Sequence, residues 1–387
     1  MRPAEDLNHK LDAREGMGSI PWWLSLLVLG TAAVLLVTPL RGIWLSYGGR
    51  WAYILLVSAL TSFGSTPLVI RLAFRFRVLD YPDGRKIHGA PTPLLGGLAI
   101  YLAFGTSILA NSIFDQQDIA ILVGASLLVL VGVLDDFHPL AAGVKLLSQL
   151  TAVAIVMGSG IALTLFRPSV FGDVANAILT IVWLLGITNA MNFFDGMDGL
   201  ATGLSIITAG LMAIVAVQTF QPLLGWFAAA MVGSCLGFLP FNFRPRRPAA
   251  IFLGDAGSTF LGFTLAALAV KGEWAENGFV DIAAPALIFW VFIFDMTYIT
   301  LARILGGKVR SFQEWIGYVG RDHLHHRLDA LLGSRRKTVL LIFLLSIAIG
   351  LAAVALRNAQ TLEAVLLILQ AVIIAIIFSI LERVGQR

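Results

Sequence analysis

Twelve long apolar runs divide the chain and constrain its fold more than any other feature of the sequence. A helix needs roughly 20 apolar residues to cross about 30 Å of hydrocarbon, so these runs predict an all-α fold, a polytopic bundle of about 11–12 membrane spans. The strands of a membrane barrel would be shorter and would alternate apolar with polar residues. The runs cover residues 22–40, 51–73, 94–113, 119–134, 143–163, 175–191, 200–218, 222–241, 252–270, 281–304, 338–356 and 361–383.

The composition agrees with a membrane protein and excludes several other classes. Apolar residues make up 58% of the 387 residues and charged residues 13%, against about 45–50% and about 25% in soluble domains. The formal net charge of +4 is too small to indicate nucleic-acid binding. Cys235 is the single cysteine and lies in an apolar run, which excludes a disulfide framework and a thiolate zinc cluster.

The distribution of basic residues predicts the orientation, because Lys and Arg are retained in cytoplasmic loops. With a cytoplasmic N-terminus, 22 of the 27 Lys and Arg residues fall on the cytoplasmic side, together with all six histidines and the clustered acids. A transporter would place its polar residues on broken helices near the middle of the bilayer. The pattern therefore indicates an enzyme whose active site lies at the cytoplasmic face.

No repeat or low-complexity tract divides the chain, so we expect one domain in three parts. Residues 1–50 are expected to form a cytoplasmic N-terminus and an extra anchoring span. Residues 51–337 are expected to form the core with its cytoplasmic catalytic loops, and residues 338–387 two further spans of the same domain.

Asp135 and Asp136 are adjacent acids at the point where the run 119–134 reaches the cytoplasm. Two acids can simply mark the boundary with water. However, a helix C-terminus disfavours negative charge by about 0.3–1 kcal/mol, and selection for stability alone would favour Lys or Arg there. We interpret the pair as carboxylates that hold a divalent cation or accept a proton from a nucleophile.

A second polar motif lies between the runs 175–191 and 200–218 and contains Asn192, Asp195 and Asp198. The two acids are three residues apart, which allows them to share one helical face. An Asp before a helix is also a good N-cap, which would give a purely structural role. The side-chain carbonyl of Asn192 suits a hard cation.

The segment Gly254-Asp255-Ala-Gly257-Ser258 opens the run 252–270. Glycines and a hydroxyl at a helix N-terminus provide backbone N–H groups for an anion, and Asp255 could hold a metal there. The alternative is a capped helix with small residues for packing.

Histidines gather in the loop 305–337, where Arg321 precedes His323, His325 and His326. Three histidines in four residues beside arginine suit a diphosphate or a sugar better than structural zinc, because no cysteine is near. A solvated basic loop that faces anionic lipid is the alternative.

The segment 80–97 combines the basic residues Arg85, Lys86 and His88 with several prolines and glycines. Prolines and glycines fix a non-helical turn. Membrane anchoring would explain the charges but not this turn, so we expect a phosphate-binding role. Asp295, inside the run 281–304, is a further functional candidate because it is ionisable within a span. Pairing with Arg303 explains it equally well.

Together these motifs resemble the polyprenyl-phosphate N-acetylhexosamine-1-phosphate transferase family, from about residue 50 to about residue 330. The resemblance rests on five motifs in this order: Asp80-x-Pro82-x-x-Arg85-Lys86-x-His88-x-x-Pro91-x-Pro93-x-x-Gly96-Gly97, Asp135-Asp136, Asn192-x-x-Asp195-x-x-Asp198-Gly199, Gly254-Asp255-x-Gly257-Ser258 and His323-x-His325-His326.

The resemblance implies transfer of a sugar 1-phosphate from a UDP-N-acetylhexosamine to undecaprenyl phosphate, with release of UMP and a requirement for Mg²⁺ or Mn²⁺. It implies that Asp135 and Asp136 are catalytic and deprotonate or orient the lipid phosphate. It implies a metal site at Asp255 and Asn192. The implied substrate-binding residues are Arg85, Lys86, His88, Asp195, Asp198, Arg321, His323, His325 and His326.

The His-x-His-His pattern led by Asp322 resembles the N-acetylglucosamine branch more than the phospho-N-acetylmuramoyl-pentapeptide branch, which is the nearest alternative. A lipid or solute transporter is the alternative outside the enzymes. Members of the family commonly have ten or eleven spans. In some members a shorter segment that contains proline precedes the histidines, and the segment 311–320 differs from it.

The expected partners are UDP-N-acetylhexosamine, undecaprenyl phosphate and membrane lipid, without nucleic acid, at the bacterial cytoplasmic (inner) membrane. The sequence leaves open whether the chain is a monomer or a homodimer. It also leaves open whether the phosphate attacks directly or through an aspartyl-phosphate.

Overall fold

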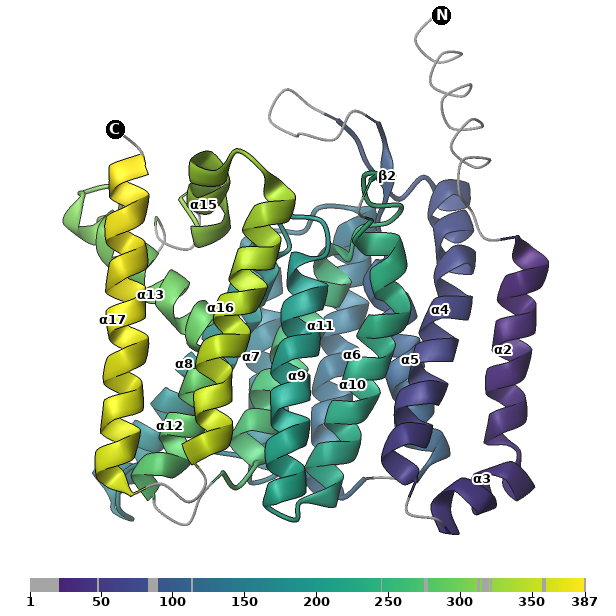
Figure 1. The fold of residues 1–387 in the computed structure, drawn as a ribbon, viewed down its shortest axis with the longest axis horizontal. Helices are drawn as coiled ribbons and strands as arrows, with labels where there is room; N and C mark the ends of the chain where they lie inside the picture. The colour runs from purple at the N-terminus through teal and green to yellow at the C-terminus, as the bar shows by residue number, and fades with distance from the viewer. Residues whose placement is uncertain are drawn as a thin grey trace, which may run out of the picture.

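The computed structural model describes residues 21–46, 49–82, 90–112, 114–244, 246–274, 278–311, 314, 320, 322–356 and 360–385. A helix or a bent helix pair occupies each of the twelve predicted apolar runs (Figure 1). Two short strands, β1 (Leu79–Asp80) and β2 (Thr92–Pro93), pair antiparallel with Leu79 opposite Pro93. The predicted all-α class is confirmed.

The helices follow one another along the described chain. They are α2 (Trp22–Leu36), α3 (Thr38–Ser46), α4 (Arg50–Phe76), α5 (Gly96–Ala110), α6 (Gln116–Phe137), α7 (Ala142–Gly158), α8 (Val170–Phe194), α9 (Leu200–Gln218), α10 (Pro222–Asn242), α11 (Gly254–Lys271), α12 (Gly278–Ile288), α13 (Trp290–Leu305), α15 (Leu324–Leu332), α16 (Arg335–Ala355) and α17 (Thr361–Gly385).

Within this part of the chain, seven helices are long and apolar enough to cross a membrane: α4, α6, α8, α9, α10, α16 and the first 19 residues of α17. The bent pair of α12 and α13 would be an eighth, and α2, α5 and α7 are shorter apolar helices. The run 281–304 is thus not one straight span, because the chain turns by 80° between the two helices. Pro285, which has no N–H to donate, lies one turn before this bend.

α11 lies in the middle of the bundle and packs against α5, α6, α8 and α9 (Figure 1). Glycines let the backbones approach closely at its first turns. A Cβ on Gly97 would lie 2.1 Å from the Cα of Gly257, and one on Gly132 would lie 2.3 Å from the Cα of Ala256. α5 and α6 therefore fix the start of α11 by direct backbone packing.

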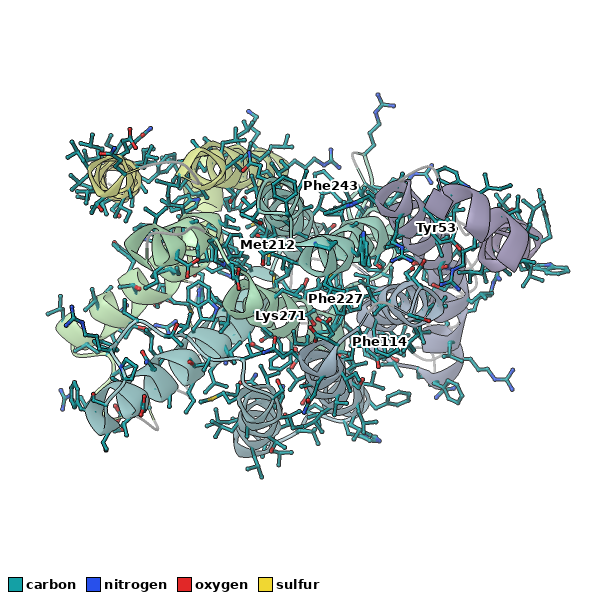
Figure 2. All side chains as sticks on the ribbon, turned by 90° about the horizontal axis from the view of Figure 1, so that it is seen from below. Tyr53, Phe114, Met212, Phe227, Phe243 and Lys271 are labelled. Atoms are coloured by element: carbon teal, nitrogen blue, oxygen red, sulfur yellow. The ribbon has the colours of Figure 1, made fainter. Side chains whose placement is uncertain are left out.

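Charged groups join α11 to α6 at the opposite end of the bundle. Asp115 caps α6 in a capping box with Asp118, and the ammonium of Lys271 contacts both carboxylates. Figure 2, viewed from this end, shows Lys271 among the helices rather than at the rim. Because Asp118 is 1% exposed, the ammonium offsets a carboxylate charge that would otherwise be costly to bury.

We predict that Gly97→Ala destabilises the fold. The added methyl has to displace the α11 backbone at Gly257, and such overpacking costs about 1–3 kcal/mol. Thermal unfolding in detergent measures the loss. Gly105→Ala in the same helix is the matched control, because a Cβ there meets nothing within 4 Å. Equal melting temperatures for the two variants would contradict the close approach of α5 and α11.

Candidate active site

Backbone hydrogen bonds hold the segment that leads into α11. Gly96 and Gly97 donate their N–H groups to the carbonyls of Phe252 and Leu253 at 3.0 and 2.8 Å, and Phe252 N–H donates to Pro93 O at 2.9 Å. Pro93, Gly96 and Gly97 thus have a structural role, which is to place the start of α11. The basic residues of that motif, Arg85, Lys86 and His88, lie outside the described residues.

The protein's own acids occupy the N-terminus of α11. Asp136, in the last turn of α6, accepts the N–H of Asp255 at 3.0 Å, and the N–H of Gly254 stabilises the charged form of Asp195. Gly254 has φ +75°, and a Cβ there would lie 2.6 Å from Asp136 Oδ2. The N–H of Asp255, one of the groups expected to bind a substrate anion, is thus bonded to Asp136 instead.

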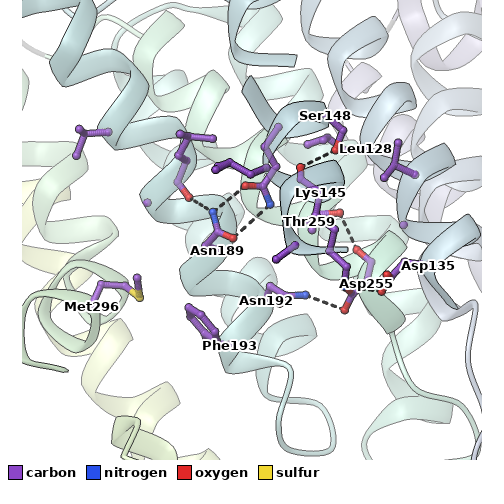
Figure 3. A pocket seen from close by; sticks show the side chains of 18 of the residues that line it. Leu128, Asp135, Lys145, Ser148, Asn189, Asn192, Phe193, Asp255, Thr259 and Met296 are labelled. Carbon is purple, nitrogen blue, oxygen red and sulfur yellow. Dashed lines mark hydrogen bonds and ion pairs between the residues drawn. The ribbon is translucent and has the colours of Figure 1, made fainter. Parts of the chain in front are cut away.

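Asp255, Asn192 and Asp135 come together around one lysine (Figure 3). Asn192 Nδ2 donates to Asp255 Oδ1 at 3.0 Å and to Ser258 Oγ at 2.8 Å. Lys145 Nζ donates to Asp135 Oδ2 at 2.6 Å and to Asp255 Oδ2 at 2.7 Å. From the sequence, Lys145 counted only as one of the basic residues that predict the orientation. Nothing in its apolar surroundings indicates that it pairs with Asp255, 110 residues away.

Asp195 and Asp198 occupy a turn between α8 and α9 rather than one helical face. Asp195 follows the last residue of α8, and the N-cap of α9 is Gly199. Asp198 accepts the N–H of Ala249 at 2.8 Å. Burial raises the pKa of Asp195 well above its usual range, and the negative charges of Asp255 and Asp136 add to this effect. The charges of the acid cluster, formed by Asp135, Asp136 and Asp255, thus reach Asp195.

Asn242 connects the two acid-bearing loops and was not singled out from the sequence. Its Oδ1 accepts the N–H of Gly199 at 3.1 Å and its Nδ2 donates to the carbonyl of Ile251 at 3.0 Å. The side chain is 2% exposed. It fixes the turn that carries Asp195 relative to the segment that leads to Asp255.

The histidine segment, which contains His323, His325 and His326, is hydrogen-bonded to α13. The fully buried Asp295 accepts His323 Nδ1 at 2.7 Å and the N–H of Leu324, the first residue of α15, at 2.6 Å. Arg303 donates two hydrogen bonds to Asp322, which lower the pKa of that carboxyl. Asp295 therefore pairs with the histidine segment, and the suggested pairing with Arg303 was wrong.

The three histidines have different surroundings. His323 stacks on Phe193 with ring centroids 4.6 Å apart. His325 is 1% exposed, neither ring nitrogen has a hydrogen-bond partner among the residues described, and burial lowers its pKa well below the usual range. His326 is partly exposed, with its ring 4.1 Å from that of His325. Arg321 lies outside the described residues.

A cavity of about 470 Å³ joins the acid cluster to the histidine segment. Asp135, Lys145 and Asp255 line one part of it, and Arg303 and His323 line another. Between them the walls are largely apolar: Leu128, Val131, Leu146, Ile181, Val182, Leu185, Met296 and Ile299. The cavity can therefore hold an apolar group together with a charged head.

The acid cluster has the chemistry of a site for a hard divalent cation. Its donors are carboxylate oxygens and the Asn192 carbonyl, and Asp136 Oδ2 is buried without a hydrogen-bond partner in the described structure. No group of three or more His, Cys, Asp or Glu side chains encloses a metal position within the described residues. Mg²⁺ is compatible with this arrangement, because it commonly binds through one or two carboxylates, substrate phosphates and water.

The fold and the cavity define a polytopic membrane protein with a carboxylate-rich site at one end of its helices. Residues 119–273 match the family described as Glycosyl transferase family 4. The chain belongs to this family of glycosyl transferases.

Proteins from several bacteria resemble most of the chain. The chain is 36% identical over 311 residues to a probable undecaprenyl-phosphate N-acetylglucosaminyl 1-phosphate transferase of Bacillus subtilis. The match covers 79% of this chain and 84% of that protein. It is 32% identical to a decaprenyl-phosphate N-acetylglucosaminephosphotransferase of Mycobacterium leprae, covering 81% and 85%. It is 31% identical to a phospho-N-acetylmuramoyl-pentapeptide-transferase of Desulforamulus reducens, covering 80% and 94%.

We predict that Asp295→Ala lowers thermal stability by detaching α15 from α13. The substitution leaves two buried donors, His323 Nδ1 and Leu324 N–H, without their acceptor, and each such loss costs about 1–3 kcal/mol. Asp329→Ala on α15 is the control, because the 3.9 Å pair of Asp329 with Arg335 is partly exposed and should contribute less than about 1 kcal/mol. A melting temperature for Asp295→Ala as high as that of Asp329→Ala would contradict this role.

Proposed function

We propose that this protein transfers N-acetylglucosamine 1-phosphate from UDP-N-acetylglucosamine to undecaprenyl phosphate, releasing UMP and forming undecaprenyl-diphosphate-N-acetylglucosamine for a cell-envelope glycan. The observation that carries the proposal is the cavity in which Asp135, Lys145 and Asp255 meet largely apolar walls. A polyprenyl phosphate has matching chemistry, with an apolar chain and a charged head. The names of the Bacillus and Mycobacterium relatives support this acceptor class and this sugar.

In the proposed reaction an oxygen of the lipid phosphate attacks the β-phosphorus of the UDP-sugar. The new bond joins that oxygen to the β-phosphorus, the bond from the β-phosphorus to the bridging oxygen breaks, and UMP leaves with the bridging oxygen. Asp135 lines the cavity and accepts the proton of the acceptor phosphate, if it carries one. Asp136 faces the start of α11, where it positions Asp255 through the N–H of that residue.

Basic side chains offset the repulsion between two anionic substrates. Lys145 lies beside the acids, and Arg303 and His323 line the other part of the cavity. Asp295 fixes Nδ1 of His323, which leaves its Nε2 for a substrate oxygen. We assign the donor diphosphate and sugar to the region between His323 and the turn containing Asp195 and Asp198.

Asp255 and Asn192 would hold the divalent cation, Mg²⁺ or Mn²⁺. The Asn192 amide nitrogen is engaged by Asp255 and Ser258, which leaves its carbonyl oxygen for a ligand. When bound, such an ion supplies positive charge to the transferred phosphoryl group.

The proposed location is the cytoplasmic (inner) membrane of a bacterium, with the acid cluster and α15 on the cytoplasmic side. The support is the positive-inside distribution of 22 of the 27 basic residues. β2, α15 and the start of α11 lie at the same end of the bundle (Figure 1). Both water-soluble UDP-sugar and membrane-bound acceptor can reach that end.

We expect the purified protein to release UMP from UDP-N-acetylglucosamine in the presence of undecaprenyl phosphate and Mg²⁺. A panel of UDP-sugars in detergent or vesicles tests this, with nucleotide release and lipid product measured together. Asp135→Asn, which removes the proton acceptor, should lower turnover by about 10²–10⁴-fold.

Two outcomes would replace the proposal. Release of UMP only from UDP-N-acetylmuramoyl-pentapeptide would assign the protein to the alternative branch, to which the Desulforamulus relative belongs by name. Movement of lipid or solute without UMP release, unaffected by Asp135→Asn, would indicate a transporter.

Removal of the divalent ion should stop turnover, and Mg²⁺ or Mn²⁺ should restore it. Asp255→Ala should stay inactive at Mg²⁺ concentrations that saturate the wild type, because its carboxylate is the proposed anchor of the ion. UMP release is the measurement, and chelated wild-type protein returned to Mg²⁺ is the control. Wild-type rates for Asp255→Ala would remove the metal assignment.

A further inference from the structure

Lys145 bridges two acids by contacting one carboxylate oxygen of each. Its ammonium lies 2.6 Å from Asp135 Oδ2 on α6 and 2.7 Å from Asp255 Oδ2 on α11. The lysine side chain is 36% exposed and lines the cavity. Figure 3 shows it, on α7, near Asp135 and Asp255 in the wall of the cavity. One positive charge therefore neutralises carboxylates contributed by two different helices.

A divalent ion at Asp255 and this ammonium require the same kind of partner. Both are cations that bind carboxylate oxygen, and they repel each other at short range. Asp255 has one oxygen engaged by Asn192 and the other by Lys145. While Lys145 remains in contact with Asp255, its positive charge weakens the attraction between Asp255 and an ion.

We propose that Lys145 and the divalent ion compete for the Asp135–Asp255 pair, and that the ion displaces the lysine ammonium into the cavity, where it binds the acceptor phosphate. The four-carbon stem of lysine allows its charge to move without movement of the helix. Lys145 is thereby a substrate-binding residue whose availability depends on metal binding. The inference rests on the proposed metal-dependent function.

The acids retain other contacts when the lysine leaves. Asp135 Oδ1 accepts the N–H of Leu140 at 2.7 Å. Asp255 keeps its hydrogen bond from Asn192 and its place in the first turn of α11. Loss of Lys145 should therefore leave both carboxylates in place and remove one positive charge from the site. The lower net charge favours a cation.

The sign of one measurement separates competition from a purely structural role. If Lys145 competes with the ion, Lys145→Met tightens Mn²⁺ binding. If Lys145 mainly holds the two acids together, the same substitution weakens it. Mn²⁺ titration of the purified full chain, followed by electron paramagnetic resonance of the free ion without substrates, measures the dissociation constant.

We expect Lys145→Met to lower the Mn²⁺ dissociation constant by about tenfold or more, equivalent to about 1.4 kcal/mol. Lys145→Arg, which keeps the charge, should stay within a few-fold of the wild type. Lys308→Met is the charge-matched control, because Lys308 is exposed in the loop after α13, and it should not change the constant. Unchanged or weaker Mn²⁺ binding by Lys145→Met would overturn the proposal.

A second measurement needs no variant. In the wild type, the rate at which an amine-specific reagent modifies Lys145, followed by mass spectrometry, should rise when Mn²⁺ is added, because the ammonium leaves its two carboxylates. A rate that does not change with Mn²⁺ saturation would contradict the release of Lys145.

Turnover then tests the acceptor contact. Lys145→Met should raise the KM for undecaprenyl phosphate more than the KM for the UDP-sugar, and an equal effect on both would contradict that contact. If the wild type releases UMP from no donor while Lys145→Met still binds Mn²⁺ more tightly, the proposed function fails and the competition stands.

Discussion

The buried N-terminus of α11 is the constraint on which the site depends. A helix start leaves N–H groups without helical partners, and where these groups are buried other polar groups must satisfy them. Here Asp136 from α6 accepts the N–H of Asp255, and Asp195, in the turn after α8, interacts with the N–H of Gly254. The helix dipole makes that position favourable for negative charge. The same interaction that completes the helix therefore gathers the acid cluster around Asp255.

In this arrangement the adjacent acids Asp135 and Asp136 have different contacts, although the sequence alone does not distinguish their roles. They lie in the last turn of one helix and point to different partners. Asp136 contacts the backbone of α11, whereas Asp135 lines the cavity and contacts Lys145. Substitutions of the two residues are thus expected to differ in kind, since Asp136 holds the position of Asp255 whereas Asp135 is the group proposed to meet the substrate.

The positions of the helices could be predicted from the sequence because each apolar run is a local signal. The order of the acid motifs likewise identified Asp135 and Asp255 as candidates. The contacts between motifs could not be predicted, because they join residues far apart in the chain: Lys145 with Asp255, Asn242 with Gly199, and Asp295 with His323. The bend between α12 and α13 was missed for a related reason, since an apolar run continues through it.

Comparison of the two lysines that join α6 to α11 explains why only one of them is suited to exchange. Lys271 is 11% exposed and is held by both acids of a capping box, one of them almost fully buried. Lys145 is 36% exposed, opens onto a cavity and bridges acids that keep other hydrogen bonds. Displacing Lys271 would strand a buried carboxylate, which is costly. Displacing Lys145 exposes two supported carboxylates to a cavity that can admit a cation, so the same kind of ion pair is structural at one end of α11 and replaceable at the other.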